Sequence, residues 1–237
     1  MHDAIQWLHL LALGSLGLAS LCAAVIFAHI NGHPQRMGIM DAVWPICALF
    51  GSVVVLIAYF CYGVRDAEDA TEAEREPAPF PVMVAKGTLH CGSGCAVGDI
   101  VAETLLLIFP AAATWFGWHW LFQEKLFAAW VLDFILAYAA GIAFQYFSIV
   151  PMKKLSPREG IVAALKADSL SLTAWQLGMY GVMALLQFEV FKPLLHAPVS
   201  AGTPEFWFAM QWAMIGGFIT SYPVNAWLIR AGIKAAM

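Results

Sequence analysis

Six long apolar stretches limit the folds open to this chain more than any other feature of its sequence. A helix that crosses the hydrocarbon core of a bilayer needs about 20 predominantly apolar residues, and each stretch reaches that length. The stretches lie at residues 5–30, 43–63, 99–122, 126–150, 169–192 and 205–229. Charged residues make up 12% of the chain, whereas soluble domains carry about 25%. The sequence therefore predicts an all-α, polytopic membrane helix bundle with six transmembrane helices in contact with the lipid bilayer.

Basic residues are distributed unevenly between the ends of these predicted spans. With the N-terminus inside, nine Lys and Arg residues fall in inner segments, and three fall in outer loops: Arg36, Lys125 and Lys192. Cytoplasmic loops of membrane proteins carry an excess of Lys and Arg. We therefore expect a multi-pass protein of the bacterial inner membrane with both termini in the cytoplasm. The first span lacks a preceding basic residue and a following small-residue cleavage site, so we expect it to be retained.

An acidic segment with alternating prolines separates the second predicted span from the third. Residues 64–87 hold this run of acidic side chains, followed by the prolines. Low hydrophobicity and high charge are typical of a solvated linker, and proline stiffens it. We therefore expect a two-helix membrane hairpin at 1–63, a cytoplasmic linker at 64–87 and a four-helix membrane core at 88–237.

The most distinctive local pattern places two thiols and an imidazole within six residues. These are His90, Cys91 and Cys95, with Gly92 and Gly94 between the thiols. Because glycine tolerates positive φ, the pattern favours a turn at the inner mouth of the third span that brings the side chains together. Soft thiolates select ions such as Cu(I) and Zn(II). We therefore assign the two cysteines and the histidine as candidate metal ligands.

A helix that began earlier would give the same residues a second geometry. Cys91, Cys95, Asp99 and Glu103 would then recur every four residues along one helix face. Carboxylates inside a bilayer cost roughly 3 kcal/mol on insertion scales and normally mark a function, so Asp99, Glu103 and Asp168 are assigned to proton or charge handling. Three alternatives stay open: inert, buried thiols, a reversible disulfide, and helix capping by Asp168.

Methionines form a second pattern on the last two predicted spans. Met179 and Met183 recur at helical spacing on the fifth span, and Met210 and Met214 do so on the sixth. Thioethers are ligands for Cu(I). If the two helix faces meet, the four side chains would extend a path of soft ligands outward from the thiols. Methionine also fills gaps in packed cores, and that alternative stays open.

Other polar residues in the predicted spans are assigned to packing between helices, where such groups form hydrogen bonds. They are Gln145, Gln176, Ser221 and Asn225. Asp133 lies on the same face of the fourth span as Gln145, and we assign it the same role.

Several ligand classes do not fit the sequence. The net charge is −4 and no basic cluster is present, which argues against a nucleic-acid partner. No nucleotide-binding loop is recognisable. Paired histidines could hold haem, but His119 stands among tryptophans, as in an interfacial aromatic belt. No haem is therefore expected.

Three motifs together resemble a bacterial multi-pass membrane family known only as a domain of unknown function. They are TLHCGSGCAVGD at 88–99, ADSLS at 167–171 and PVNAWLI at 223–229. The resemblance extends over residues 85–237. Some members of that family carry a histidine-rich N-terminal tail, which implies a metal, whereas here only His2 and His9 stand near the N-terminus.

These patterns lead to the hypothesis of a membrane protein that binds and transports a soft metal ion, best matched by Cu(I). The Cys, His and acidic residues would form the entry site, and the methionines would line the path. Two alternatives remain: a non-catalytic subunit of a larger membrane assembly or homo-oligomer, and a thiol-disulfide oxidoreductase using Cys91 and Cys95. No catalytic residue is assigned, and a non-enzymatic role is favoured.

Overall fold

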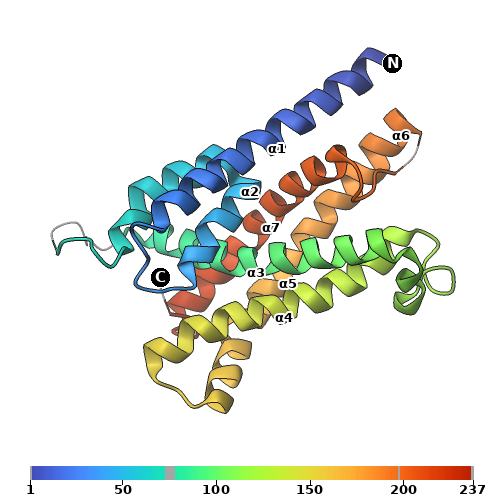
Figure 1. Ribbon diagram of the computed structural model, residues 1–237. Coiled ribbons are helices and arrows are strands. Elements are labelled where there is room, and N and C mark those ends of the chain that lie inside the picture. Colours follow the sequence, from blue (N-terminus) through green and yellow to red (C-terminus); the bar gives the residue numbers. More distant parts are fainter. Residues whose placement is uncertain (1, 73–77, 197, 236–237) are drawn as a thin grey trace.

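The described part of the chain is a bundle of helices without a β-strand (Figure 1). The computed structural model describes residues 2–72, 78–196 and 198–235. The elements in chain order are α1 (His2–Ile30), α2 (Met40–Ala58), η1 (Tyr59–Gly63), η2 (Val64–Asp66), α3 (Phe80–Ile108), η3 (Pro110–Phe116), α4 (Lys125–Lys153), α5 (Pro157–Leu185), η4 (Leu186–Phe191), α6 (Lys192–Leu195) and α7 (Pro204–Arg230). The predicted all-α architecture is confirmed.

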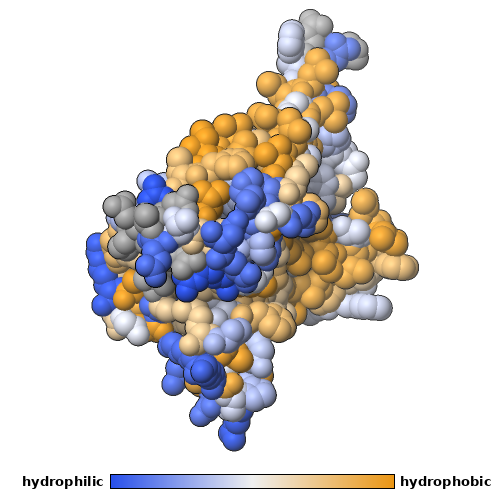
Figure 2. Space-filling view, turned by 60° about the vertical axis from the view of Figure 1, so that its left-hand side comes forward, coloured by the Kyte–Doolittle hydropathy of each residue, from blue (hydrophilic) through white to orange (hydrophobic). Residues whose placement is uncertain are grey.

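Five helical segments of the described chain are long and apolar enough to cross a membrane. They are Ile5–Ile30, Met40–Asp66, Phe80–Ile108, Lys125–Lys153 and Pro157–Leu195. Helix α7 has 27 residues but is not among these apolar segments, so the predicted count of six is not confirmed. Large apolar side chains remain exposed along the bundle, and hydrophilic residues gather at the end turned towards the viewer in Figure 2. Such a surface fits contact with a lipid bilayer.

Helix α3 lies at the centre of the bundle. Seventeen of its 29 residues are buried, more than in any other described helix. It begins at Phe80, inside the segment predicted as a linker, and it ends at Ile108 instead of extending over 99–122. The glycines and the serine in the middle of α3 lower the local hydropathy, so the apolar stretch at 99–122 begins later than the helix itself.

The glycines of α3 allow close packing between helices and do not form the predicted turn. A Cβ atom on Gly94 would lie 2.5 Å from the Cα of Gly141, and one on Gly98 would lie 2.3 Å from the Cα of Ala137. The backbones of α3 and α4 therefore touch, as small residues permit in membrane bundles. Gly92 receives the ring of Trp175 from α5. The predicted turn is thus wrong, and the alternative of an early helix is present.

Helix α2 folds back on itself at Ser52, whose φ of 45° and ψ of −129° interrupt the helix. The rings of Trp44 and Tyr59 are 5.5 Å apart, although a straight helix would separate these residues by about 22 Å at 1.5 Å per residue. The chain also returns to its starting level, because the backbone N–H of Arg36 donates to the carbonyl of Asp66 at 3.0 Å. Met40–Asp66 is therefore a helical hairpin and not the single straight helix predicted at 43–63 (Figure 1).

The two ends of the described chain lie at opposite ends of the bundle (Figure 1). Helices α1 and α7 run parallel, because His9 Nδ1 lies 2.6 Å from Glu205 and Ser15 donates to Gln211 at 2.6 Å. Lys234, which follows α7, lies at the far end beside the start of α3. The hairpin removes one crossing, so this geometry does not match the expectation that both termini lie on one side.

The re-entrant path predicts the accessibility of three introduced cysteines. In a Cys61→Ser background, Gly38→Cys and Glu72→Cys should react with a membrane-impermeant maleimide from the same side of sealed vesicles. Gln123→Cys, in the α3–α4 connection, should react from the other side. If α2 crossed the membrane, Gly38 and Glu72 would be labelled from opposite sides.

The contact between α3 and α4 predicts that a single methyl group at Gly94 destabilises the bundle. Gly94→Ala places a Cβ against the α4 backbone, and overpacking of this kind costs about 1–3 kcal/mol. Gly181→Ala is the matched control, because a Cβ there meets no atom within 4 Å. Thermal unfolding in detergent should show a lower midpoint for Gly94→Ala alone, and equal midpoints would contradict the close contact.

Candidate functional site

One buried face of α3 carries the sulfur and carboxyl groups identified in the sequence. Cys91, Cys95 and Asp99 are fully buried, and Glu103 is 7% exposed. The helix is continuous through all four, so they line one face at four-residue spacing. The two thiols interact with each other. This row lies along the middle of the bundle, not at the inner mouth of a span, because α3 begins earlier than predicted.

Side chains from α5 and α7 cover this face. The Sγ atom of Cys91 lies 3.5 Å from Ser171 Oγ, and Gln176 Nε2 donates to Asp99 Oδ1 at 3.3 Å. Ser221 of α7 donates to the backbone carbonyl of Ser171 at 3.0 Å. Gln176 and Ser221 therefore connect neighbouring helices. Gln145 of α4 is buried, and its side-chain oxygen has no hydrogen-bond partner among the described residues.

An ion pair closes one end of the row. Lys234 and Asp168 form a salt bridge in which both side chains are fully buried. Ser171 also donates to Asp168 Oδ1 at 2.9 Å, while Lys234 donates to Asn225 Oδ1 at 2.8 Å and to the carbonyl of Gly87 at 3.3 Å. Asp168 is thus charge-compensated and lies in mid-helix, so it does not cap α5. Ser156 performs that role through a capping box.

Lys234 reaches the bundle interior because the chain reverses after α7. Gly232 has a φ of 70°, a backbone conformation that glycine adopts without steric cost. The backbone N–H of Ile233 donates to the carbonyl of Leu228 at 3.0 Å, which fixes the reversal. The charge pattern of the sequence predicts Lys234 only as one of the nine basic residues of the inner segments and does not predict this buried contact. The glycine two residues before the lysine is the signal that could have found it.

A group of three acids lies at the other end of the row. Asp133 of α4 is 1% exposed and interacts electrostatically with Glu103 and Asp99 of α3. Both carboxyl oxygens of Asp133 and Oδ2 of Asp99 have no hydrogen-bond partner among the described residues. Buried carboxyl groups that interact with one another need protons or a bound cation to balance their charge, and Lys125, which acts electrostatically on Glu103, is only partly buried. Asp133, assigned to packing from the sequence, therefore belongs to the site.

The four methionines lie beside the acids, on the far side of the thiols from the ion pair. Hydrogen bonds between α5 and α7 fix an antiparallel register, which sets Met179 level with Met214 and Met183 level with Met210. All four are buried in one apolar cluster. The two predicted faces therefore meet.

Cavities reach two of the acids. Asp99 lines a cavity of about 190 Å³ together with Met210 and Met214, and Phe50 at the tip of the α2 hairpin borders it. Glu103 lines a second cavity of about 170 Å³ near the α5–α7 connection. The acids are therefore the part of the row closest to open space.

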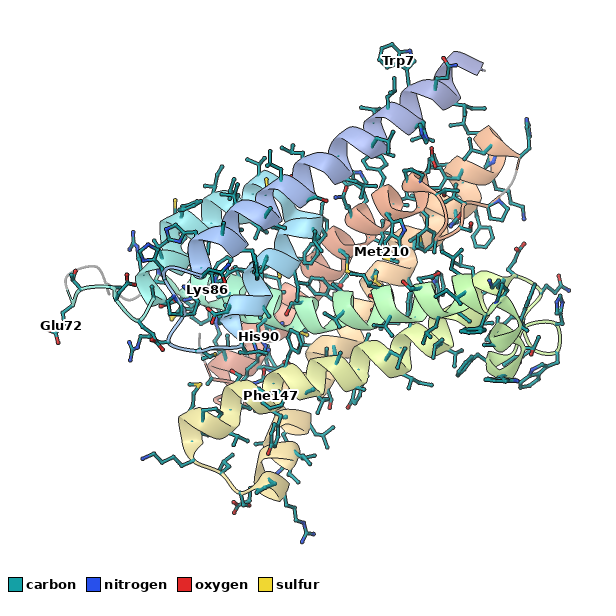
Figure 3. All side chains as sticks on the ribbon, viewed as in Figure 1. Trp7, Glu72, Lys86, His90, Phe147 and Met210 are labelled. Carbon is teal, nitrogen blue, oxygen red and sulfur yellow. The ribbon has the colours of Figure 1, made fainter. Side chains whose placement is uncertain are left out.

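His90 does not join the thiols. Its ring faces Phe144 of α4, with ring centroids 6.4 Å apart, and it lies between α3 and α4, away from Met210 (Figure 3). Neighbouring residues of a helix point about 100° apart, so His90 and Cys91 would have converged only in the predicted turn. No group of three or more His, Cys, Asp or Glu side chains in the described chain is arranged to hold a metal ion.

The sequence of the α3–α7 region identifies the family. Residues 82–234 match the model of a family described as a domain of unknown function, DUF4396. The chain belongs to the DUF4396 family. This match confirms the predicted resemblance. The matched residues include every residue of the row, whereas α1 and the α2 hairpin precede them. The chain matches no curated protein and no solved structure.

The buried ion pair of this DUF4396 protein predicts a strong effect of removing one partner. Lys234→Met leaves the Asp168 charge buried and uncompensated, which typically costs about 3–5 kcal/mol. The Asp168→Asn/Lys234→Met double variant removes both charges and should regain much of that loss. Lys153→Met, at an exposed position, is the control. The unfolding midpoint in detergent is measured for each variant. If the double variant showed no recovery relative to Lys234→Met, the pairing would be contradicted.

Proposed function

We propose that this protein is a carrier of the bacterial inner membrane that binds and transports a soft metal ion, with Cu(I) the best match to its ligands. The observation that carries the proposal is the buried face of α3, where Cys91 and Cys95 stand in line with Asp99 and Glu103. Thiols and buried acids occur together there, beside the methionines of α5 and α7, inside a bundle with a lipid-compatible surface.

The thiol pair supplies the first ligands. Residues four apart on a helix have Cβ atoms about 5–6 Å apart, so Cys91 and Cys95 can hold one ion between their sulfurs. Soft thiolates favour Cu(I), and this pair needs no contribution from His90. Metal binding to thiols releases their protons. Asp99 lies on the same helix face as Cys95 and is suited to accept one of those protons.

The methionines extend the ligand set away from the thiols. Met179 and Met214 are buried in the same apolar cluster, and Met214 lines the cavity beside Asp99. A soft ion that left the thiols would therefore meet thioethers next. Thioethers bind Cu(I) without carrying a charge, which suits a transit site more than a storage site.

The charge distribution suggests an orientation for this carrier. With α2 turned back, nine described Lys and Arg residues lie at the end that carries the α2–α3 connection, whereas Lys125 and Lys192 lie at the other end. The positive-inside rule places the first end in the cytoplasm. The N-terminus would then lie outside, and the ion pair of Asp168 and Lys234 would face the cytoplasmic half.

A thiol-disulfide oxidoreductase is a weaker candidate on this geometry. Exchange requires that a partner thiol or disulfide reaches the attacking sulfur. Both Cys91 and Cys95 are fully buried, and the accessible thiol of the described chain is that of Cys61.

A binding experiment with matched double variants tests the proposal. Cu(I) is titrated into the reduced, detergent-purified protein in competition with a chromogenic chelator. Cys91→Ser/Cys95→Ser should weaken Cu(I) binding at least about tenfold, because the soft ligands are lost. Cys22→Ser/Cys47→Ser removes two other buried thiols and should bind as the unmodified protein does. Equal binding by the two double variants would exclude the thiol pair and favour a subunit role.

A transport measurement separates binding from movement. In proteoliposomes, Met183→Leu/Met210→Leu should slow Cu(I) transfer while the affinity measured in detergent stays unchanged, because the thiols remain. Unchanged transfer in this variant would contradict the methionine path.

A further inference from the structure

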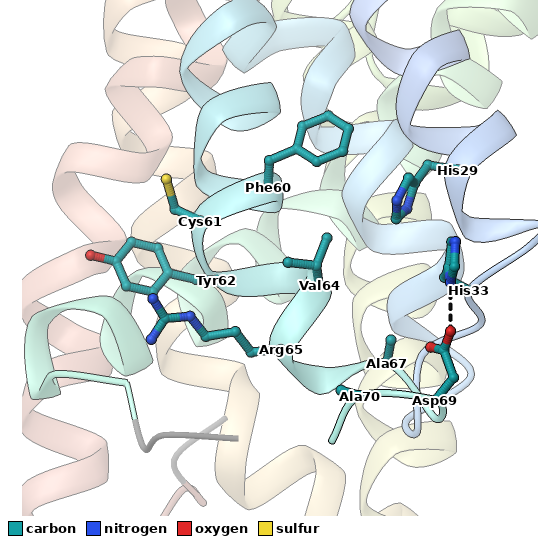
Figure 4. Close-up of a pocket in the computed structure, with 10 residues that line it drawn as sticks. All are labelled: His29, His33, Phe60, Cys61, Tyr62, Val64, Arg65, Ala67, Asp69 and Ala70. Atoms are coloured by element: carbon teal, nitrogen blue, oxygen red, sulfur yellow. Dashed lines mark hydrogen bonds and ion pairs between the residues drawn. The ribbon is translucent and has the colours of Figure 1, made fainter. Parts of the chain in front are cut away.

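A second polar site lies outside the row on α3, at the end of the bundle where the α2 hairpin begins and ends. A cavity of about 850 Å³ there is bordered by His29, His33 and Asp69 (Figure 4). His29 is in the last turn of α1, and the backbone N–H of His33 donates to the carbonyl of His29 at 3.1 Å. The helical path therefore continues to His33, and the two imidazoles lie one turn apart on the same face.

The two rings are held side by side. Their centroids are 4.5 Å apart with an interplanar angle of 29°. His29 Nδ1 lies 2.9 Å from the hydroxyl of Tyr59, and His33 Nδ1 lies 2.6 Å from Asp69 Oδ2. Both partners come from the returning arm of the hairpin and the segment after it. The Nε2 atom of neither ring forms a hydrogen bond with another described residue.

The tautomer of His33 follows from its partner. The Asp69 side chain is 55% exposed, and an exposed carboxyl group is ionised at neutral pH and can only accept a hydrogen bond. In its neutral form His33 then donates from Nδ1, which leaves the lone pair on Nε2. A histidine whose Nδ1–H is fixed by a carboxylate and whose Nε2 is free has the arrangement of a metal ligand with its outer-shell partner.

We propose that His29 and His33 form a binding site for a divalent transition metal ion such as Zn(II), with their Nε2 atoms as ligands and water completing the coordination. Tyr59 and Asp69 orient the two rings. Imidazole suits Zn(II), Cu(II) and Ni(II). The site uses none of the thiols or methionines of the proposed Cu(I) path, so the two proposals stand or fall separately.

Metal at this site connects α1 to the hairpin. Both ligands belong to the end of α1, whereas their orienting partners belong to the hairpin and the segment that follows it. A bound ion would therefore fix the end of α1 against the point where the chain leaves the hairpin. A ligand that binds the folded state raises its stability in proportion to the logarithm of its concentration.

Zn(II) titration of untagged, detergent-purified protein tests the site by calorimetry and by thermal unfolding. We expect one Zn(II) per chain and a rise in the unfolding midpoint, both lost in His29→Ala/His33→Ala. The matched control is His119→Ala/His196→Ala, which removes two exposed imidazoles elsewhere and should retain both effects. Equal Zn(II) binding by the two double variants would overturn the proposal.

A milder variant covers the case in which the double variant does not fold. Asp69→Asn removes only the orienting charge, and loss of such a partner weakens metal binding about 10–100-fold. With Cu(II) as a spectroscopic probe, electron paramagnetic resonance should show coupling to two imidazole nitrogens. Coupling to fewer than two, or unchanged Zn(II) affinity in Asp69→Asn, would contradict the site.

Discussion

Because lipid offers no hydrogen-bond partner, a helix as polar as α3 can stand in a membrane bundle only if neighbouring protein surrounds it. Gly94 and Gly98 let α4 approach to backbone contact, and Gly92 accepts the ring of Trp175. Other polar groups are satisfied within the helix, as where the hydroxyl of Thr88 donates to the carbonyl of Val84. This enclosure places the thiols and acids of α3 in the interior, where their chemistry is shielded from both lipid and bulk water.

The two ends of the buried row balance charge differently. At one end Asp168 has Lys234 as a permanent partner. At the other end Asp99, Glu103 and Asp133 interact with one another, and Lys125, the cation that acts on Glu103, is only partly buried. Oxygens of Asp99 and Asp133 have no hydrogen-bond partner among the described residues. Natural proteins leave buried polar groups without hydrogen-bond partners mainly at functional sites. The end with the three acids, which borders two cavities, is therefore where the proposed function would place a bound ion or proton.

The sequence predicted the helical class and the family, and it offered the four-residue spacing on α3 as the alternative to a turn, because each depends on composition or on local periodicity. It did not predict the start of α3, because the glycines and polar residues in the first half of this buried helix lower its apolar content there. The hairpin of α2 was missed for the opposite reason. Its residues are as apolar as those of a span, and the reversal depends on the backbone at Ser52 alone. The burial of Lys234 depends on a chain reversal that charge patterns do not encode.

The hairpin links the two candidate sites. Its tip, at Phe50, borders the cavity beside Asp99, and its returning arm supplies Tyr59 to the histidine pair. The family match begins within α3, so the hairpin and α1 pack onto a region that already contains the whole row of thiols and acids. The histidine pair and the cavity beside Asp99 therefore lie at the base and at the tip of the same hairpin, and the two proposals, though tested separately, concern parts of one connected element.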